Sequence, residues 1–240
     1  MNITSRDRQI FKFIEEYGAI TNQQATSIFF AGVQGSSSRR LTALEKSNIL
    51  VSYQRGYNKV YSFVEGRQLS LHDIGVLDFY AYIYRIGGEI IDFQRTPHYL
   101  NNTLIPDALV KFRIPFEDGS LLCKAFIEYD LNHYSSETKF AVSYEKLRRE
   151  KTLESYCGES KFPLIIVARP TPGIRYNSKN FNIIYTDLKF NNVEKFIYSL
   201  FNWWTRWFSH LSYFLFLLFH SRYAYSLFYW IQTIAQPCHF

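Results

Sequence analysis

The chain has 240 residues, a formal net charge of +6 and a pI of about 9.1, and 19% of its residues are aromatic. This length allows one large domain or two small ones with real cores, and the basic balance suits a nucleic acid or an anionic membrane as partner. The three cysteines show no CxxC spacing, which argues against a disulfide framework or a zinc site and favours a reducing cytoplasm.

The first part of the chain, residues 1–67, is expected to contain three helices. Apolar residues recur at helical spacing after Ser5, which is a suitable N-cap. A second helix is predicted from Thr21, its own N-cap, to about Phe30. A third is predicted over Ser38–Lys46, after a loop of glycines and serines.

A hairpin is predicted next, with strands at Leu50–Arg55 and Lys59–Val64 and a turn at residues 56–58. Three helices followed by a hairpin are typical of a winged helix-turn-helix, whose third helix enters the major groove of double-stranded DNA while the wing touches the backbone. The residues predicted to contact DNA are Arg39, Arg40, Thr42, Lys46, Arg55, Tyr57 and Lys59. The alternative is a solvated basic face used for protein contacts.

Residues 68–190 are predicted to form an α/β domain in the order helix, three strands, helix, two strands. The expected helices are Leu71–Ile86, which Gly87-Gly88 ends, and Ser136–Tyr156. The expected strands are Glu89–Phe93, Ile105–Ile114, Leu121–Tyr129, Leu164–Ala168 and Ile183–Tyr185. The fourth of these strands is continuously apolar, which indicates that it is covered on both faces.

Carboxylates stand near the ends of two of these strands. Asp107 belongs to the second strand, and Glu128 and Asp130 come at the end of the third. Strand alternation puts Phe126, Glu128 and Asp130 on one face of the sheet. With this element order they resemble the core of the PD-(D/E)xK nucleases, the restriction-endonuclease-like fold. In that fold the Asp and Glu hold Mg²⁺, and a lysine two positions after the Glu orients the attacking water.

Asp130 takes the position of that lysine. The resemblance implies that Asp107, Glu128 and Asp130 gather at one Mg²⁺, with cleavage weak or absent because the protein supplies no cation there. A lysine from the following helix, Lys139 or Lys146, could reach in and supply it. The alternatives are a degenerate site without a cofactor and an active Mg²⁺-dependent DNA endonuclease.

No other motif points to chemistry. GxGxxG, GxxxxGK[ST], HExxH and GxSxG are absent from the sequence. His72 and His98 have no partner at ligand spacing, so neither is expected to bind a metal.

Three stretches together carry a resemblance to a family. They are Arg8-Gln9-Ile10 through Gln24, Arg39-Arg40-Leu41 with Leu44, and Pro106-Asp107-Ala108 with the run from Phe126 to Asp130. Over about residues 5–187 the chain resembles the replication-relaxation family of bacterial plasmids and integrative elements. This implies a DNA-binding winged helix joined to a nuclease-like domain, working with relaxation or replication proteins of the element. Where the family has a glycine after the third helix, this chain has Asn48, which also tolerates a positive φ.

The last segment, residues 191–240, is aromatic and apolar and has no acidic residue after Glu194. Apolar stretches within residues 196–234 are shorter than the ~20 residues that a bilayer-spanning helix needs. Three interpretations stay open: an interfacial segment that contacts a membrane surface or another subunit, a helix pair packed on the preceding domain, and an extension without a selected role.

The sequence thus predicts a cytoplasmic protein, peripheral at the membrane if the tail binds there, that binds the DNA of a mobile genetic element in replication, relaxation or mobilisation. An endonuclease is one alternative, and a membrane-tethered adaptor that recruits element DNA is another.

Overall fold

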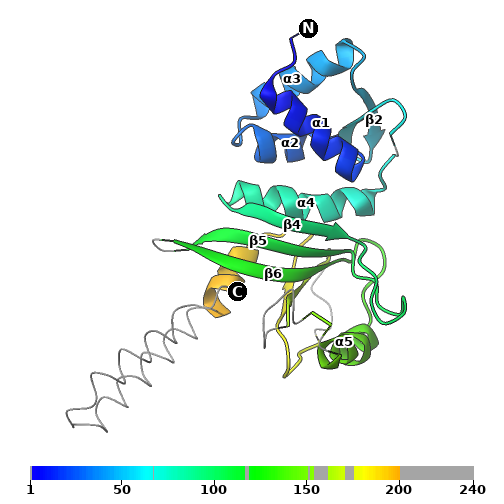
Figure 1. The fold of residues 1–240 in the computed structure, drawn as a ribbon, viewed down its shortest axis with the longest axis vertical. Coiled ribbons are helices and arrows are strands. Elements are labelled where there is room, and N and C mark those ends of the chain that lie inside the picture. Colours follow the sequence, from blue (N-terminus) through cyan, green and yellow to red (C-terminus); the bar gives the residue numbers. More distant parts are fainter. Residues whose placement is uncertain are drawn as a thin grey trace, which may run out of the picture.

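The computed structural model describes residues 2–66, 68–116, 119–150, 152–153, 162–170 and 176–200. Within these ranges the chain is a mixed α+β structure with a three-stranded and a five-stranded sheet. Figure 1 shows the N-terminal helices at one end, helix α4 beneath them, and the strands β4, β5 and β6 below α4. We call residues 2–62, which contain the small sheet, the N-terminal unit.

Helices α1 (Ser5–Tyr17) and α2 (Asn22–Phe29) each begin with a capping box. The cap of α1 is Thr4 and not Ser5 as predicted, because the Thr4 hydroxyl accepts a hydrogen bond from the Asp7 amide and the Asp7 carboxylate accepts one from the Thr4 amide. The predicted cap of α2, Thr21, is confirmed, and Gln24 completes its box.

Helix α3 spans Gln34–Lys46 and therefore begins earlier than predicted. A tertiary contact outweighs the poor helix propensity of its first residues: the buried Ser37 hydroxyl lies 2.6 Å from the Thr26 hydroxyl and donates to Asn22 Oδ1 at 3.0 Å. After the helix, Asn48 has a φ of 56°, as the sequence predicted for this position.

The small sheet has the order β1-β3-β2, with β1 at Ile20–Thr21, β2 at Val51–Arg55 and β3 at Asn58–Ser62. The two-residue turn between β2 and β3 contains Gly56, whose φ is 58°. Strand β1 was not predicted, since two residues are too few to show an alternating pattern.

The larger sheet has the order β4-β5-β6-β7-β8. Strands β4, β5 and β6 are antiparallel neighbours, whereas β6, β7 and β8 run parallel. The elements of this part are α4 (Leu71–Arg85), β4 (Glu89–Arg95), β5 (Ala108–Phe116), β6 (Gly119–Tyr129), β7 (Leu164–Ala168) and β8 (Ile183–Thr186). The predicted order of helices and strands is confirmed, and Gly87, with a φ of 81°, follows the end of α4.

The long helix predicted at Ser136–Tyr156 is shorter and differently wound. A π-helix, η1, runs over Lys139–Tyr144 and is followed by α5, Glu145–Arg149. Phe140 and Tyr144 are buried against the sheet on the side away from α4. Of the last part of the predicted helix, residues 151 and 154–156 lie outside the described residues.

Helix α4 is covered on two sides. Its buried residues include Leu77 and Phe79, which belong to the core cluster that also contains Ile10 of α1 and Val110 of β5. The Gln24 side chain of α2 donates to the Ile74 carbonyl at 3.1 Å and to Asp78 at 2.8 Å. The N-terminal unit and the sheet therefore share one core.

Residues 193–200 are helical and return to that core. Val193 and Ile197 are buried, and the Tyr198 hydroxyl donates to the Pro115 carbonyl at 2.6 Å. The rest of the predicted tail, residues 201–240, lies outside the described residues, so the three interpretations of it stay open. Among the described helices, none combines the length and apolar character needed to cross a bilayer.

The close approach of Gly88, between α4 and β4, to strand β5 gives a stability test. A methyl group at Gly88 would lie 2.3 Å from the Arg113 carbonyl oxygen. We expect Gly88→Ala to lower the free energy of unfolding by about 1–3 kcal/mol, because backbone must move to admit it. In the control, Gly35→Ala, the new methyl meets nothing within 4 Å and should not destabilise. Equal denaturation midpoints for Gly88→Ala and the native protein would contradict this packing.

Candidate functional site

The solvent-facing side of α3 carries most of the predicted DNA contacts that remain accessible. Ser37, Leu41 and Leu44 are buried against the rest of the N-terminal unit. At about 100° per residue, the side opposite them holds Gly35, Arg39, Thr42 and Lys46. Arg39 and Lys46 are exposed, and Thr42 is half-buried. We call these four residues the α3 outer face; it presents two cations and a hydroxyl to solvent.

Arg40 points elsewhere. Its Nε donates to Asp7 Oδ1 at 2.7 Å, its Nη2 pairs with Asp7 Oδ2, and Nη2 also donates to the Asn2 carbonyl at 2.8 Å. Burial raises the pKa of Asp7, but the hydrogen bonds from Arg40 and Thr4 and the charge of Arg40 outweigh it and lower that pKa to about 2. Arg40 therefore ties α3 to α1, which the sequence did not predict, and its contact with DNA stays a prediction.

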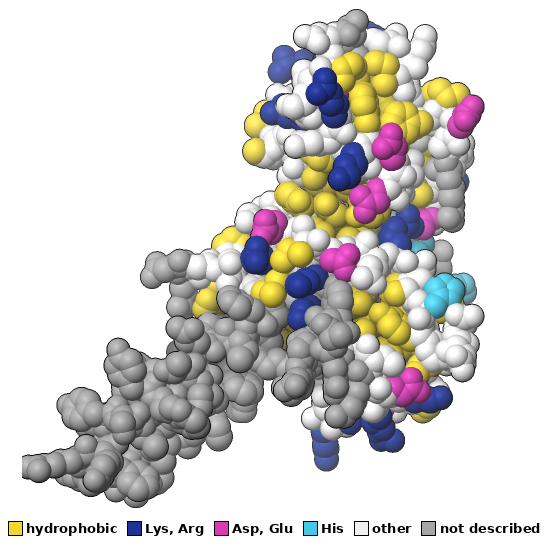
Figure 2. Space-filling model, in the orientation of Figure 1, with side chains coloured by type: hydrophobic (Ala, Val, Ile, Leu, Met, Phe, Trp, Pro, Cys, Tyr) yellow, Lys and Arg dark blue, Asp and Glu magenta, His cyan; other side chains and the backbone are white. Residues whose placement is uncertain are grey.

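The turn between β2 and β3 projects one aromatic side chain. Tyr57 is 105% exposed, whereas Arg55 Nε donates to the Leu69 carbonyl at 3.1 Å. Lys59 pairs with Glu45 of α3 at 2.7 Å, but an exposed pair of this kind is weak, so Lys59 stays able to meet a phosphate. Figure 2 shows Lys and Arg side chains gathered over α1 and α3 on the visible face.

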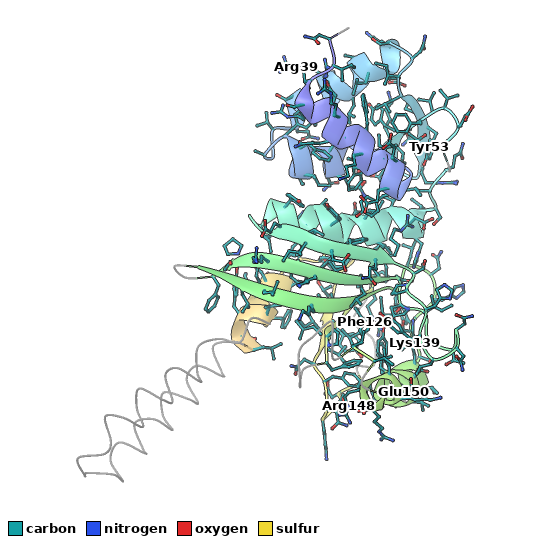
Figure 3. The ribbon with its side chains drawn as sticks, viewed as in Figure 1. Arg39, Tyr53, Phe126, Lys139, Arg148 and Glu150 are labelled. Carbon is teal, nitrogen blue, oxygen red and sulfur yellow. The ribbon has the colours of Figure 1, made fainter. Side chains whose placement is uncertain are left out.

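On the far side of the larger sheet, Glu128 of β6 is 2% exposed and both of its oxygens are bonded. Lys139 Nζ donates to Oε2 at 2.6 Å and the Tyr144 hydroxyl donates to Oε1 at 2.5 Å. Figure 3 shows Lys139 close to Phe126 below the sheet. The following segment η1 thus places a lysine, Lys139, beside Glu128.

The π-helix explains how both donors reach one carboxylate. Lys139 and Tyr144 are five residues apart, which in an α-helix would place them well over a quarter turn from each other. In a π-helix, residues i and i+5 are successive along the same side. The unusual winding of η1 therefore aligns the ammonium and the hydroxyl over Glu128.

The environment of Glu128 favours its protonated form. Burial raises the pKa of Glu128 to about 7, and the charge of Asp107 adds to this effect. The ammonium of Lys139 and the hydroxyl of Tyr144 act in the opposite direction without cancelling it. Near neutral pH this carboxyl group is poised between its two protonation states.

Asp107, directly before β5, has a partner that sequence reasoning missed. Its Oδ2 accepts a hydrogen bond from the Tyr129 amide at 2.6 Å and lies 3.2 Å from His72 Nε2 of α4. The hydrogen bond to Asp107 raises the pKa of His72. His72 has no partner at metal-ligand spacing in the sequence. Its contact with Asp107 joins α4 to the start of β5, and no spacing in the sequence could have revealed it.

Asp130 faces a different group. Its Oδ2 pairs with Arg169 Nη2 at 2.7 Å, and its Oδ1 accepts from the Ser135 amide at 2.9 Å and hydroxyl at 2.8 Å. The Arg169 guanidinium also lies over the Tyr134 and Tyr185 rings. Tyr129 and Ala168 pair in register at the ends of β6 and β7, so the next residue of each strand is a neighbour. Asp130 and Arg169 each directly follow a predicted strand, and this placement is the sequence signal that could have identified the pair.

These pairings do not form the predicted Mg²⁺ site. Among the described residues, no group of three His, Cys, Asp or Glu side chains is placed to hold a metal ion. Asp130 is occupied by Arg169, while Glu128 is occupied by Lys139 and Tyr144. The three carboxylates therefore do not fit one ion in this arrangement, in contrast to the expectation from sequence.

Comparisons with known proteins do not indicate a function. No protein-family model matches the chain, and no curated protein matches it.

The Arg40–Asp7 pair predicts a pH-dependent loss of stability. Arg40→Ala leaves the buried Asp7 carboxylate without its cation, which should cost about 2 kcal/mol or more at pH 7. Because the folded pKa of Asp7 is depressed, this contribution is present above pH 4 and fades as the pH falls toward 2. The loss should therefore shrink in acid.

Urea denaturation at several pH values would measure this difference between Arg40→Ala and the native protein. Arg39→Ala is the matched control, since Arg39 is exposed on the α3 outer face and should change stability little. Equal effects of the two substitutions would contradict a structural role for Arg40.

The raised pKa of Glu128 predicts that stability depends on pH in the opposite direction. Its folded pKa is raised, so its contribution is fully present below about pH 4.5 and is lost as the pH rises through about 7. Glu128→Gln should therefore stabilise the protein at pH 8 by up to about 3 kcal/mol, at about 1.4 kcal/mol per pKa unit, and have little effect at pH 4. The exposed Glu137→Gln is the control. A Glu128→Gln protein less stable than the native one at pH 8 would overturn the assignment.

Proposed function

We propose that the chain is a DNA-binding protein of a mobile genetic element, acting in plasmid replication, DNA relaxation or mobilisation, and that the N-terminal unit is its winged helix. The observation that carries the proposal is the α3 outer face, where Arg39, Thr42 and Lys46 point to solvent opposite the buried side of the helix. The resemblance to the replication-relaxation family supports the biological setting.

Several features of the N-terminal unit support a major-groove contact. The outer face joins cations that attract phosphates to a small residue, Gly35, that allows close approach of the duplex. Tyr57 at the β2–β3 turn is fully exposed, and Lys59 follows it at the start of β3, as a wing that touches the backbone requires. No described acidic residue belongs to the outer face itself.

The proposal predicts a salt-dependent affinity for double-stranded DNA. Fluorescence anisotropy with labelled duplex should show that Arg39→Ala with Lys46→Ala weakens binding by about 1–3 kcal/mol, roughly tenfold to a hundredfold. The slope of log affinity against log salt should fall by about one for each phosphate contact that is lost.

Lys179→Ala is the control, because Lys179 is exposed between β7 and β8 and away from the N-terminal unit. Its affinity should match that of the native protein. If the Arg39/Lys46 double variant keeps its fold by circular dichroism and still binds DNA with undiminished affinity, α3 is not the interface.

A second candidate function is cleavage of DNA by the carboxylate region, taken as a PD-(D/E)xK-like core. The observation that favours it is the cation of Lys139 at 2.6 Å from Glu128, since this restores the charge that position 130 lacks. A lysine ammonium beside a scissile phosphate would stabilise negative charge that develops during hydrolysis. Because the three carboxylates do not fit one Mg²⁺ as they stand, we derive no step through a metal.

Incubation with supercoiled DNA, with and without Mg²⁺ or Mn²⁺, separates the two candidates. If the chain cuts DNA, Asp107→Ala and Lys139→Met should each abolish nicking, whereas Lys146→Met should not, because Lys146 is exposed and pairs with Glu150. Binding without cleavage under every condition would leave the DNA-binding role alone and reject the second candidate.

A further inference from the structure

A surface notch lies between α1 and α3, beside the α3 outer face. It has a volume of about 390 Å³ and is lined by residues of both helices and by Phe30. Arg39 belongs to both the notch and the outer face. A helix in the major groove is flanked by the two phosphate backbones, so DNA held on the outer face would bring one backbone to the mouth of the notch.

The charges in the notch do not cancel. Arg40 and Asp7 neutralise each other at its base. Arg6 and Arg39 are both exposed, and no acidic side chain among the described residues forms an ion pair with either. The notch therefore carries two uncompensated guanidinium groups from two different helices.

Both guanidinium groups are already held in place. The Arg6 guanidinium lies over the Phe30 ring, 4.7 Å from its centroid, and Arg39 Nε donates to the Gly35 carbonyl at 3.1 Å. The Nη groups of Arg39 stay available as donors. Guanidinium groups bind phosphate oxygens through paired hydrogen bonds, and fixing them beforehand lowers the entropic cost of doing so.

We infer that the notch binds one phosphate group of the DNA backbone, with Arg6 and Arg39 as its ligands. The inference rests on the proposed function and adds to it a specific subsite and a residue, Arg6, that lies outside the α3 outer face. A free phosphate anion has the same chemistry, and the experiment distinguishes the two sources.

The test uses the full chain, labelled duplex DNA and anisotropy over a range of salt. Arg6→Ala should weaken binding roughly threefold to tenfold and lower the salt slope by about one. Ala43→Leu keeps every charge but fills the notch, since Ala43 lines it, and should also weaken binding. Lys12→Ala removes an exposed cation of α1 that does not line the notch and should leave affinity unchanged.

The outcomes separate the inference from the proposed function. If the native protein binds no duplex, the proposed function fails. If Arg39→Ala weakens binding while Arg6→Ala and Ala43→Leu bind DNA as the native protein does, the notch does not bind the DNA phosphate, but the proposed function stands. If inorganic phosphate raises the melting temperature of the native protein but not of Arg6→Ala, while duplex affinity is equal in both, the notch takes the free anion and the DNA assignment is wrong.

Discussion

The burial of α4 on both sides is the constraint on which the rest of the molecule depends. Tyr80 packs its ring against Phe13 of α1, whereas Phe79, about 100° away around the helix, packs against Phe112 of β5. A helix that is apolar on nearly all sides is stable only when other elements cover it all round. The N-terminal unit and the larger sheet are therefore not independent, because each supplies one half of the cover. This makes the orientation of α3 relative to the sheet a property of the fold.

Charged groups in the two parts have separate tasks as a result. In Figure 3, Arg39 lies at the end of the N-terminal unit away from the sheet, and Lys139 lies beyond the sheet. The buried Arg169–Asp130 pair and the partly buried Arg40–Asp7 pair fix neighbouring elements to each other. The exposed cations of the α3 outer face have no such partner among the described residues and are free to meet an anion. Burial, more than residue type, thus decides which arginines hold the protein together and which stay available to solvent and ligands.

Sequence patterns were sufficient for most features with a local physical cause, although the cap of α1 is Thr4 where Ser5 was predicted. The cap at Thr21, the positive φ of Asn48, the alternation along β6 and the element order all follow from neighbouring residues, and the structure has them as predicted. The contacts that sequence missed join residues far apart in the chain or depend on unusual winding. They are the Ser37 contact with α2, the Arg40–Asp7 pair, His72 with Asp107, Arg169 with Asp130, and the alignment of Lys139 and Tyr144 by η1. An arginine in the sequence of a recognition helix looks the same whether it faces DNA or a buried aspartate.

Hydrogen–deuterium exchange with and without a saturating DNA duplex tests the central claim most directly, because it reports the contact surface without a substitution. The account predicts slower exchange after DNA is added in two segments, α3 at residues 34–46 and the β2–β3 turn at residues 55–59. Strands β7 and β8, which are in the part of the sheet away from the N-terminal unit, should be unchanged. Protection confined to η1 and α5, with α3 unaffected, would contradict the account and place the DNA on the other side of the molecule.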